Sequence, residues 1–337
     1  MIQAAIIGAS GYTGRELVRL LTQHPLIQLV SCYVSANNAA DNLELSSMHP
    51  SLLGQTHISA NKLGPNELAT LANKYDVIFL ATPHQQSHDW MDALLAGKAK
   101  IIDLSGAFRL SDIGLFSQYY GFSHQSAAAL TQAVYGLAEY YPEQISRASL
   151  IAVPGCYPTA SLLALKPLVQ AGLLNPDVRP VINAVSGVSG AGKQATPGSH
   201  FCEVSLQAYG VLSHRHTPEI EEYANTQVIF TPHLGAFKRG ILATVTVALT
   251  SDDASQIDNA YLRAYANSQF VHLRKDFPRV DDVAHTPFAH IGYKFDPKSK
   301  YIVSTCAIDN LLKGAASQAV QCANLVLGLS MEEGLIC

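Results

Sequence analysis

An apolar run at residues 4–7 leads straight into a glycine-rich loop, and a helical pattern follows the loop. The loop reads Gly8-Ala9-Ser10-Gly11-Tyr12-Thr13-Gly14. Its spacing is not G-x-G-x-x-G, but its place between a first strand and a first helix is where a dinucleotide pyrophosphate binds. Glycines let the backbone approach the phosphates, and the helix N-terminus offers free N–H groups. The alternative is a turn with helix-capping residues. We favour a dinucleotide site made by Gly8, Ser10, Gly11, Tyr12, Thr13 and Gly14.

The first half of the chain alternates strand-like apolar runs with helical patterns. The runs lie at 4–7, 29–34, 77–81 and 101–104, with helical patterns between some of them, as at 15–23 and 89–96. This alternation predicts a parallel sheet with helices on both faces. The runs are apolar nearly throughout, as strands are when both faces of their sheet are covered. The predicted fold class is α/β.

The second half is patterned differently. A strand at 149–153 ends at Pro154-Gly155, and a helix is predicted at about 159–171. Longer strand-like stretches follow at 181–185, 228–231, 241–249 and 301–307. Alternating Val, Thr and Ala at 243–249 suit a half-buried antiparallel strand, so this part is predicted to be α+β. The last helical pattern, about 313–327, carries apolar residues all round, which predicts a buried helix.

Length and charge exclude several classes of protein. A chain of 337 residues corresponds to about two domains. The net charge of -4, without any basic cluster, argues against nucleic-acid binding. No apolar stretch approaches the roughly 18 residues of a membrane span, and the N-terminus lacks the pattern of a signal peptide. We therefore expect a cytoplasmic protein.

The end of the second predicted strand bears on the choice between NAD and NADP. NAD sites usually place an acid there to hold the ribose 2′-hydroxyl. Here the strand runs into Ser35 and then Ala36-Asn37-Asn38, and no acid appears until Asp41. A 2′-phosphate would meet no repulsion, and Ser35 could donate a hydrogen bond to it. The pattern favours NADP(H), although no Arg or Lys marks a dedicated phosphate clamp.

One cysteine stands apart from the others in its local context. The chain has six cysteines: Cys32, Cys156, Cys202, Cys306, Cys322 and Cys337. None forms a C-x-x-C pair, and for five of them we expect a small buried side chain. Cys156 lies in Pro154-Gly155-Cys156-Tyr157-Pro158, just before the predicted helix. A thiol at a helix N-terminus is stabilised as the thiolate, so Cys156 is the predicted nucleophile. The alternative is a buried cysteine in a tight turn.

A nucleophilic thiol needs an acid or base beside it. The best candidates are His214 and His216 in His214-Arg215-His216-Thr217-Pro218-Glu219. On an extended segment, positions 214 and 216 would face the same side. The alternatives are a solvated surface loop or a metal pair. No Cys or carboxylate motif completes a tetrahedral ligand set, so we expect no metal.

A second glycine loop follows the predicted strand at 181–185. It runs from Ser186 and Gly187 to Lys193. Its backbone N–H groups could shape the nicotinamide end of a cofactor site or hold a phosphate. A flexible linker is the alternative.

Together these motifs resemble one enzyme family. The glycine loop, the Cys156 motif, His214-Arg215-His216-Thr217-Pro218-Glu219-Ile220 and Asp309-Asn310-Leu311-Leu312-Lys313-Gly314 occur in the order found in N-acetyl-γ-glutamyl-phosphate reductases. That family belongs to the aspartate-semialdehyde dehydrogenase superfamily. The resemblance covers essentially the whole chain. One departure is Ala107, where many members carry Asp.

The resemblance implies a fold and a set of roles. It implies a Rossmann NADP-binding domain over 1–152, a mixed α+β catalytic and dimerisation domain over 153–312, and a final helix, 313–330, that packs back on the first domain. Cys156 would be the nucleophile, and His214 and His216 would share acid–base work and substrate binding. Arg109 and Glu219 would bind substrate, and Asn310 would contact nicotinamide along with Ser186 and Gly187. The family habit is a homo-oligomer, either a dimer or a tetramer.

The implied reaction is reduction of an acyl phosphate by NADPH through a cysteine thioester, in arginine biosynthesis. Three alternatives remain: an aspartate-semialdehyde dehydrogenase, a thiol hydrolase with a merely structural glycine loop, and a nucleotide-binding sensor without turnover. The motif around His214 and His216 favours the reductase over the sister dehydrogenase.

Overall fold

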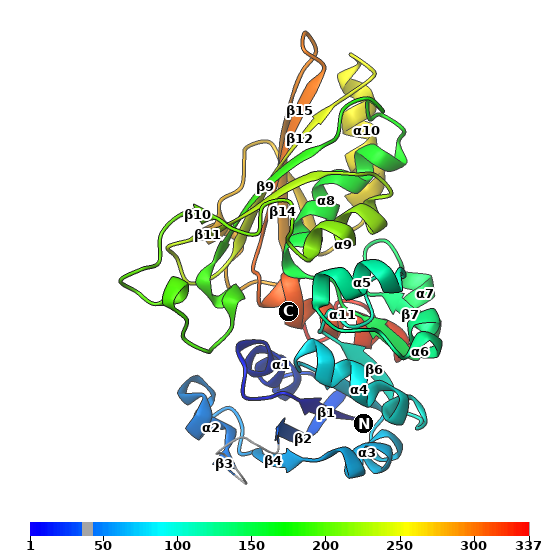
Figure 1. The fold of residues 1–337 in the computed structure, drawn as a ribbon, viewed down its shortest axis with the longest axis vertical. Coiled ribbons are helices and arrows are strands. Elements are labelled where there is room, and N and C mark those ends of the chain that lie inside the picture. The colour runs from blue at the N-terminus through cyan, green and yellow to red at the C-terminus, as the bar shows by residue number, and fades with distance from the viewer. Residues whose placement is uncertain (36–42, 337) are drawn as a thin grey trace. The chain divides into compact units, whose positions relative to one another are not determined.

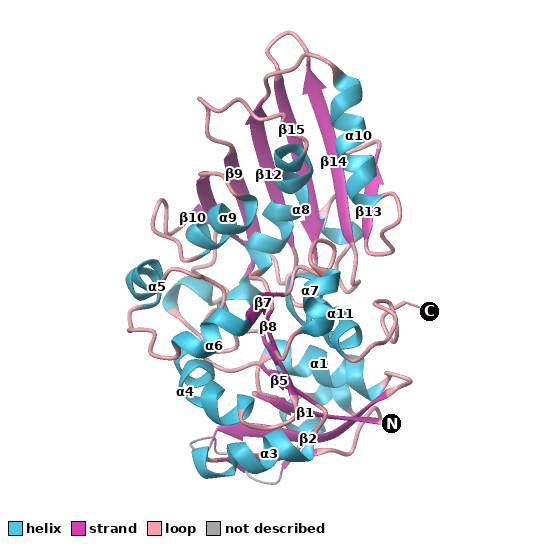
Figure 2. Ribbon diagram, turned by 90° about the vertical axis from the view of Figure 1, so that its right-hand side faces the viewer, coloured by secondary structure: helices cyan, strands magenta, loops and turns pink. Residues whose placement is uncertain are grey.

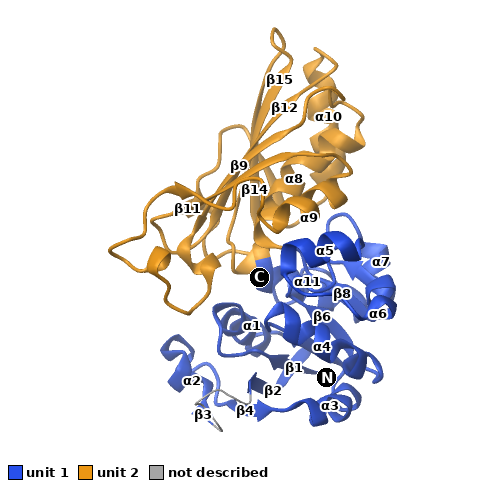
Figure 3. Ribbon diagram, in the orientation of Figure 1, with its two compact units in different colours: residues 1–154, 315–337 blue, residues 155–314 orange. Residues whose placement is uncertain are grey.

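The computed structural model describes residues 1–35 and 43–336 (Figure 1). The chain divides into two compact units, drawn in different colours in Figure 3. Unit 1 comprises Met1–Pro154 and Ala315–Cys337, and unit 2 comprises Gly155–Gly314. Among the helices of the described ranges, none is long and apolar enough to cross a membrane.

Unit 1 is built on an eight-stranded sheet with the order β3-β4-β2-β1-β5-β6-β8-β7. Its strands are β1 (Ile2–Ile7), β2 (Ile27–Ser35), β3 (Leu43–Glu44), β4 (Ser59–Leu63), β5 (Val77–Leu80), β6 (Lys100–Asp103), β7 (Ala133–Tyr135) and β8 (Leu150–Ala152). All neighbours pair in parallel except β3 with β4. Central strands such as β5 are buried at every position, as expected when helices cover both faces of a sheet.

Within the described ranges, seven α-helices of unit 1 lie between these strands along the chain, and an eighth comes from the end of the chain. They are α1 (Tyr12–Thr22), α2 (Leu45–Met48), α3 (Leu68–Lys74), α4 (His84–Leu95), α5 (Ile113–Tyr120), α6 (Ala127–Gln132), α7 (Pro142–Arg147) and α11 (Ser317–Val326). Side chains of α3 and α4, including Leu71, Met91 and Leu94, join the strands in one hydrophobic core. The predicted α/β class is confirmed. The elements β3, β4, β7 and α5–α7 were not predicted.

Helix α11 is buried on nearly all sides, as its apolar circumference predicts. It contacts α1, α7 and β6. The burial also includes polar side chains, which need partners inside the protein. Asn324 shows how this is met: its amide bonds the His24 ring at 3.1 Å and donates to the carbonyls of Met331 and Glu333.

Unit 2 is a seven-stranded mixed sheet with the order β10-β11-β9-β12-β15-β14-β13. Its strands are β9 (Val181–Gly187), β10 (Gln207–Ala208), β11 (Ile229–Gly235), β12 (Ile241–Ala248), β13 (Val271–Arg274), β14 (Ala289–Asp296) and β15 (Tyr301–Ile308). Its helices are α8 (Cys156–Gln170), α9 (His216–Ala224) and α10 (Ala254–Tyr265). Figure 2 shows these helices over one face of the sheet. In β12, buried and half-buried residues alternate, which confirms the predicted half-buried strand.

Helix α8 is the central support of unit 2. It packs on β12, β15 and β9 and against α9 and α10. Pro167 lies inside this helix and cannot donate to the carbonyl of Leu163, four residues earlier. The hydroxyl of Tyr265 on α10 donates to that carbonyl at 2.6 Å, and Tyr261 donates to the next carbonyl, of Ala164, at 2.7 Å. The Leu163 carbonyl, which the proline leaves without its helical donor, is therefore still hydrogen-bonded.

Some predicted boundaries were wrong. The helix expected from about residue 159 begins at Cys156, because the turn at Gly155 already starts the helical bonding. The helix expected at 313–327 is a π-helix at Leu312–Ala316 followed by α11. Strand β14 was not predicted, since Gly292 and the polar residues around it mask its alternation.

Candidate active site

The glycine loop of unit 1 is closely packed at Gly8 and Gly14 and open at Gly11. Gly8 has a φ of 99°, and a Cβ there would lie 2.3 Å from the Ala81 carbonyl oxygen. A Cβ on Gly14 would lie 2.4 Å from the Gly8 oxygen, so packing within the protein requires both glycines. Gly11 differs, because a Cβ there would meet a single atom, at 3.9 Å. Space is therefore open beside Gly11, the N-cap of α1, where a phosphate would approach the helix N-terminus.

The backbone of this loop is held from outside. The N–H groups of Gly8 and Ala9 both donate to the Tyr33 carbonyl, at 2.8 and 3.1 Å. The buried ring of His49 lies 2.9 Å, through Nε2, from the Ala9 carbonyl. Ser10, Tyr12 and Thr13 are half-buried at the surface of the loop. No sequence signal pointed to His49, which lies 40 residues away along the chain.

Strand β2 ends at Ser35, which is exposed. The stretch that follows, with Asn37, Asn38 and Asp41, lies outside the described residues. The preference for NADP that the missing acid indicates therefore stays a prediction from the sequence.

In unit 2, Cys156 is the first residue of α8 and is partly exposed. The Gly155 carbonyl accepts hydrogen bonds from the Thr159 N–H and hydroxyl, each at 2.9 Å. Because a trans peptide points its C=O and N–H in opposite directions, the Cys156 N–H points beyond the helix N-terminus. A Cβ on Gly314 would lie 2.8 Å from the Cys156 Cβ, so only glycine fits against the cysteine there. The thiol thus lies at the positive end of a helix dipole.

The two predicted histidines lie together, on either side of a turn rather than along an extended segment. Arg215 is helical and α9 begins at His216, so the chain turns between the two rings. Their centroids are 4.8 Å apart, and the His216 N–H donates to His214 Nδ1 at 3.1 Å. His216 is buried, whereas His214 is half-buried. Burial, helped by the charge of Arg215, lowers the pKa of His214 to about 4.

The lowered pKa of His214 predicts how stability depends on pH. The folded pKa lies below the unfolded value of 6.5, so the stability it contributes is full above pH 6.5 and is lost as the pH falls toward 4. Between pH 7 and 4.5, His214→Gln should lose about 1–3 kcal/mol less unfolding free energy than the unmodified protein. Urea unfolding of both proteins at the two pH values measures the difference. Parallel losses would contradict the assignment.

Tyr157 is an aromatic neighbour that sequence reasoning missed. Its ring centroid lies 5.8 Å from that of His214 and 5.9 Å from that of His216. Its hydroxyl donates to the His233 carbonyl at 2.8 Å, and Tyr209 donates to the same hydroxyl at 3.3 Å. Burial raises the pKa of both tyrosines, so both stay neutral and act as fixed walls of the histidine pair. The one signal for Tyr157 was its place directly after Cys156.

Ser186, Gly187 and Asn310 come together at the ends of β9 and β15. A Cβ on Gly187 would lie 2.6 Å from the Arg239 nitrogen, so the two backbones are in close contact. The Asn310 oxygen accepts the Gly240 N–H at 2.7 Å, and its Nδ2 donates to the Ser189 hydroxyl at 3.0 Å. The two hydrogen bonds fix the orientation of the amide.

Asp309, next to Asn310, is fully buried and well bonded. It forms an ion pair with Arg239 at 2.5 Å and accepts the backbone N–H groups of His285, Leu311 and Leu312. Its side-chain oxygens are thus bonded both to a guanidinium and to backbone N–H groups, as a buried carboxylate requires. This pair was not predicted, because its members are 70 residues apart.

Two residues predicted to bind substrate contact the backbone. In unit 1, the buried Arg109 donates from Nε to the Val153 carbonyl at 2.8 Å and from Nη2 to the Leu104 carbonyl at 2.9 Å. In unit 2, the fully buried Glu219 accepts the Gly155 N–H at 2.8 Å. Their binding of substrate stays a prediction.

The remaining cysteines are mostly as expected. Cys32, Cys306 and Cys322 are buried, and Cys337 lies outside the described residues. The expectation was wrong for Cys202, which is exposed in the long connection between β9 and β10. Across residues 1–35 and 43–336, His, Cys, Asp and Glu form no group of three or more that could hold a metal ion.

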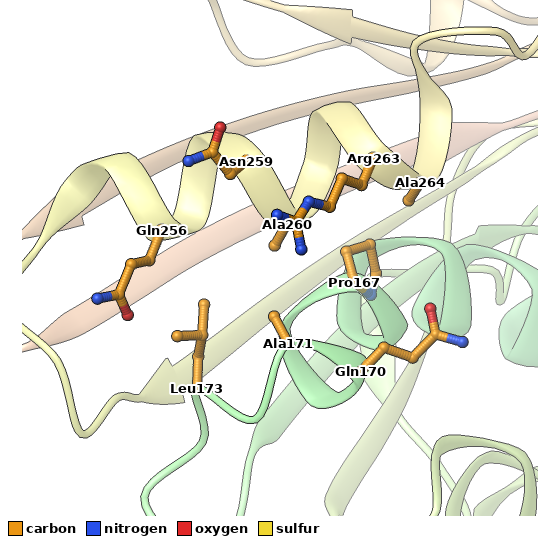
Figure 4. A pocket seen from close by; sticks show the side chains of 9 residues that line it. All are labelled: Pro167, Gln170, Ala171, Leu173, Gln256, Asn259, Ala260, Arg263 and Ala264. Carbon is orange, nitrogen blue, oxygen red and sulfur yellow. The ribbon is translucent and has the colours of Figure 1, made fainter.

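A pocket of about 400 Å³ lies between α10 and the end of α8 (Figure 4). Its lining includes Pro167, Leu173 and Arg263. Pro167 follows Cys156 by eleven positions, or roughly 16 Å at 1.5 Å per helical residue. The pocket is therefore separate from the cysteine and the histidines.

Comparison with known proteins identifies both parts of the chain. Residues 3–148 match the semialdehyde dehydrogenase NAD binding domain, and residues 156–310 match the semialdehyde dehydrogenase dimerisation domain. Among solved structures, aspartate semialdehyde dehydrogenase II from Vibrio cholerae, complexed with ASA, has a TM-score of 0.73 at 18% identity, covering 97% of this chain and 98% of that one. The aspartate semialdehyde dehydrogenase with NADP from Candida albicans has a TM-score of 0.69 at 12% identity, with the same coverage. At these identities the likeness shows the fold alone.

Closer relatives are found among curated sequences. The N-acetyl-gamma-glutamyl-phosphate reductase of Alteromonas mediterranea is 57% identical over 100% of both chains. That of Pasteurella multocida is 51% identical, again over 100% of both. The order of motifs is thus accompanied by full-length similarity, and this chain belongs to the N-acetyl-γ-glutamyl-phosphate reductase family.

Proposed function

We propose that this chain reduces N-acetyl-γ-glutamyl phosphate to N-acetyl-L-glutamate 5-semialdehyde and phosphate, using NADPH, in arginine biosynthesis. The observation that carries the proposal is 57% identity over the full length of a reductase of this name. The solved aspartate semialdehyde dehydrogenases share the fold at only 12–18% identity, so that alternative has less support.

The residues of unit 1 fit the cofactor. The open space beside Gly11 and the N-terminus of α1 would receive the pyrophosphate. Gly8, Ser10, Tyr12, Thr13 and Gly14 would surround it, and Ser35 would lie toward the 2′-phosphate. In unit 2, Asn310, Ser186 and Gly187 would contact the nicotinamide. Bound NADPH supplies the hydride for the reduction.

Cys156 begins the reaction as a thiolate. Its sulfur attacks the acyl carbon of the substrate, and the carbonyl oxygen becomes an oxyanion. The Cys156 N–H, which points beyond the helix N-terminus, is placed to stabilise that charge. The C–O bond to phosphate then breaks, phosphate leaves, and a thioester remains on Cys156.

The two histidines take different roles in this proposal. His214 Nδ1 accepts a backbone N–H, and its pKa is about 4, so at neutral pH the ring is uncharged. It can bind a substrate oxygen through Nε2–H but is a poor source of a proton. We assign the proton transfer to His216. After reduction of the thioester, the hemithioacetal anion expels the cysteine sulfur, His216 protonates the sulfur, and the aldehyde is released.

A coupled assay tests the function. NADP should be reduced rapidly when the enzyme meets N-acetylglutamate semialdehyde and phosphate, and slowly with aspartate semialdehyde. Equal or better kcat/KM with aspartate semialdehyde would favour the sister dehydrogenase. NADP binding without turnover would favour a sensor, and thiol hydrolysis without cofactor binding would favour a hydrolase.

We predict a preference for NADP over NAD, because no acid follows the second strand before Asp41. The measurement is kcat/KM with each cofactor under the same conditions. An equal or higher value with NAD would contradict the prediction.

The match to a dimerisation domain indicates a homo-oligomer, and we propose a dimer or a tetramer. We also propose that residues 1–152 with the helix at 313–330 bind the cofactor, while residues 153–312 carry catalysis and dimerisation. A cytoplasmic location stays a prediction.

A further inference from the structure

Glu219 is a buried charged side chain that contacts the turn carrying the nucleophile. It lies on α9, three residues after His216, and is fully buried. Its Oε1 accepts the N–H of Gly155 at 2.8 Å. Gly155 is the N-cap of α8 and directly precedes Cys156. The carboxylate therefore links the start of the histidine helix to the start of the cysteine helix.

The hydrogen bond from Gly155 to Glu219 fixes one of the two peptide planes of the turn, and Thr159 fixes the other. The peptide that follows Gly155 is held by Thr159, which donates twice to the Gly155 carbonyl. The peptide that precedes Gly155 is held by Glu219. Gly155 has no side chain of its own to limit its conformation. With both peptide planes held, the direction of the Cys156 N–H and the position of the Cys156 Cα are fixed.

We propose that Glu219 is a positioning residue, which holds the nucleophile turn in register with His216 through the hydrogen bond to Gly155 rather than binding substrate. The proposal rests on the proposed function, since it concerns the thiolate and proton donor of that reaction. The negative charge of Glu219 would also repel the α-carboxylate of an N-acylglutamate substrate, which argues against a role in binding it. What the turn requires from Glu219 is an acceptor atom at the right reach.

Three variants separate reach from charge. Glu219→Gln removes the charge but keeps an oxygen at the same distance, so kcat should stay within about threefold of the unmodified enzyme. Glu219→Asp keeps the charge but is one methylene shorter, and Glu219→Ala removes the acceptor. Both should lower kcat by about 10–100-fold, because misplacement by about 1 Å can cost that much. KM for the semialdehyde and for NADP should change less than about twofold.

The pre-steady-state burst separates positioning from folding. With semialdehyde and NADP but no phosphate, each active site should form one NADPH before turnover stalls. Glu219→Asp should keep the burst amplitude and lower its rate constant. A variant that merely lost folded enzyme would lose amplitude and keep the rate constant. Glu222→Gln and Glu222→Asp, at a half-buried position of the same helix, are the matched controls and should behave as the unmodified enzyme.

The relative activities of Glu219→Asp and Glu219→Gln decide the proposal. If Glu219→Asp were active and Glu219→Gln inactive, the charge would matter and positioning by reach would be overturned. If the Glu219 variants raised KM for the semialdehyde and left kcat unchanged, Glu219 would be a substrate-binding residue instead. The proposed function fails separately, if the unmodified enzyme shows no burst or if Cys156→Ala keeps its activity.

Discussion

Cys156→Ala is expected to abolish the burst of NADPH that the unmodified enzyme forms from semialdehyde and NADP when phosphate is left out. The unmodified enzyme should form about one NADPH per active site and then slow to the rate of thioester hydrolysis, as covalent catalysis requires. Phosphate should restore fast turnover by accepting the acyl group. Stopped-flow absorbance of NADPH measures the amplitude and both rates.

Binding of NADP should survive this substitution, because the glycine loop is separate in sequence from the cysteine. Cys156→Ser should bind substrate with little turnover, since a hydroxyl is a far weaker nucleophile than a thiolate at neutral pH. Cys202→Ala is the matched control, because Cys202 is an exposed cysteine of the same unit. Steady turnover without phosphate, or a burst from the alanine variant, would remove Cys156 from the reaction.

His216→Ala is expected to lower kcat by about 10²–10⁴-fold, the usual loss when a general acid is removed. His214→Ala should act mainly through KM for the semialdehyde, because its ring is neutral and can donate only a hydrogen bond. Steady-state kinetics at pH 7 with each variant separates the two effects. The exposed His200 provides a control substitution that should leave both constants unchanged.

Two results would overturn these assignments. If both histidine variants kept near-full activity, neither ring would act in the reaction. If His214→Ala lost kcat and His216→Ala lost only affinity, the roles would be reversed. Bound zinc lost from either variant would revive the metal interpretation.

Local chemistry accounts for the correct predictions. Strands β1, β5 and β6 form apolar runs because helices cover both faces of their sheet, so burial is visible in the sequence itself. The requirement for Gly8 and Gly14 is also visible in the sequence, because close backbone contacts exclude any side chain at these positions. Cys156 could be placed at a helix start because the chain around it contains the turn and the helix in direct succession.

Local patterns misled where a turn or a polar partner intervened. The segment from His214 to His216 carries no signal that separates extended from helical backbone, and the two rings meet across a turn instead of along an extended segment. The buried amide of Asn324 likewise depends on carbonyls supplied by the residues after the helix. Short strands such as β10 are defined by pairing with a neighbour and have too few residues for a period.

The sequence by itself determined the α/β class, the glycine loop, the cysteine at a helix start and the family. Only the tertiary structure decided which distant atoms the buried charged side chains contact. Glu219 contacts Gly155 across 64 residues, Arg239 contacts Asp309 across 70, and Arg109 contacts Val153 across 44. Patterns of burial arise within one element and repeat at its period, so they can be read along the chain. A single hydrogen bond between distant residues has no period, and it exists only once both elements have packed.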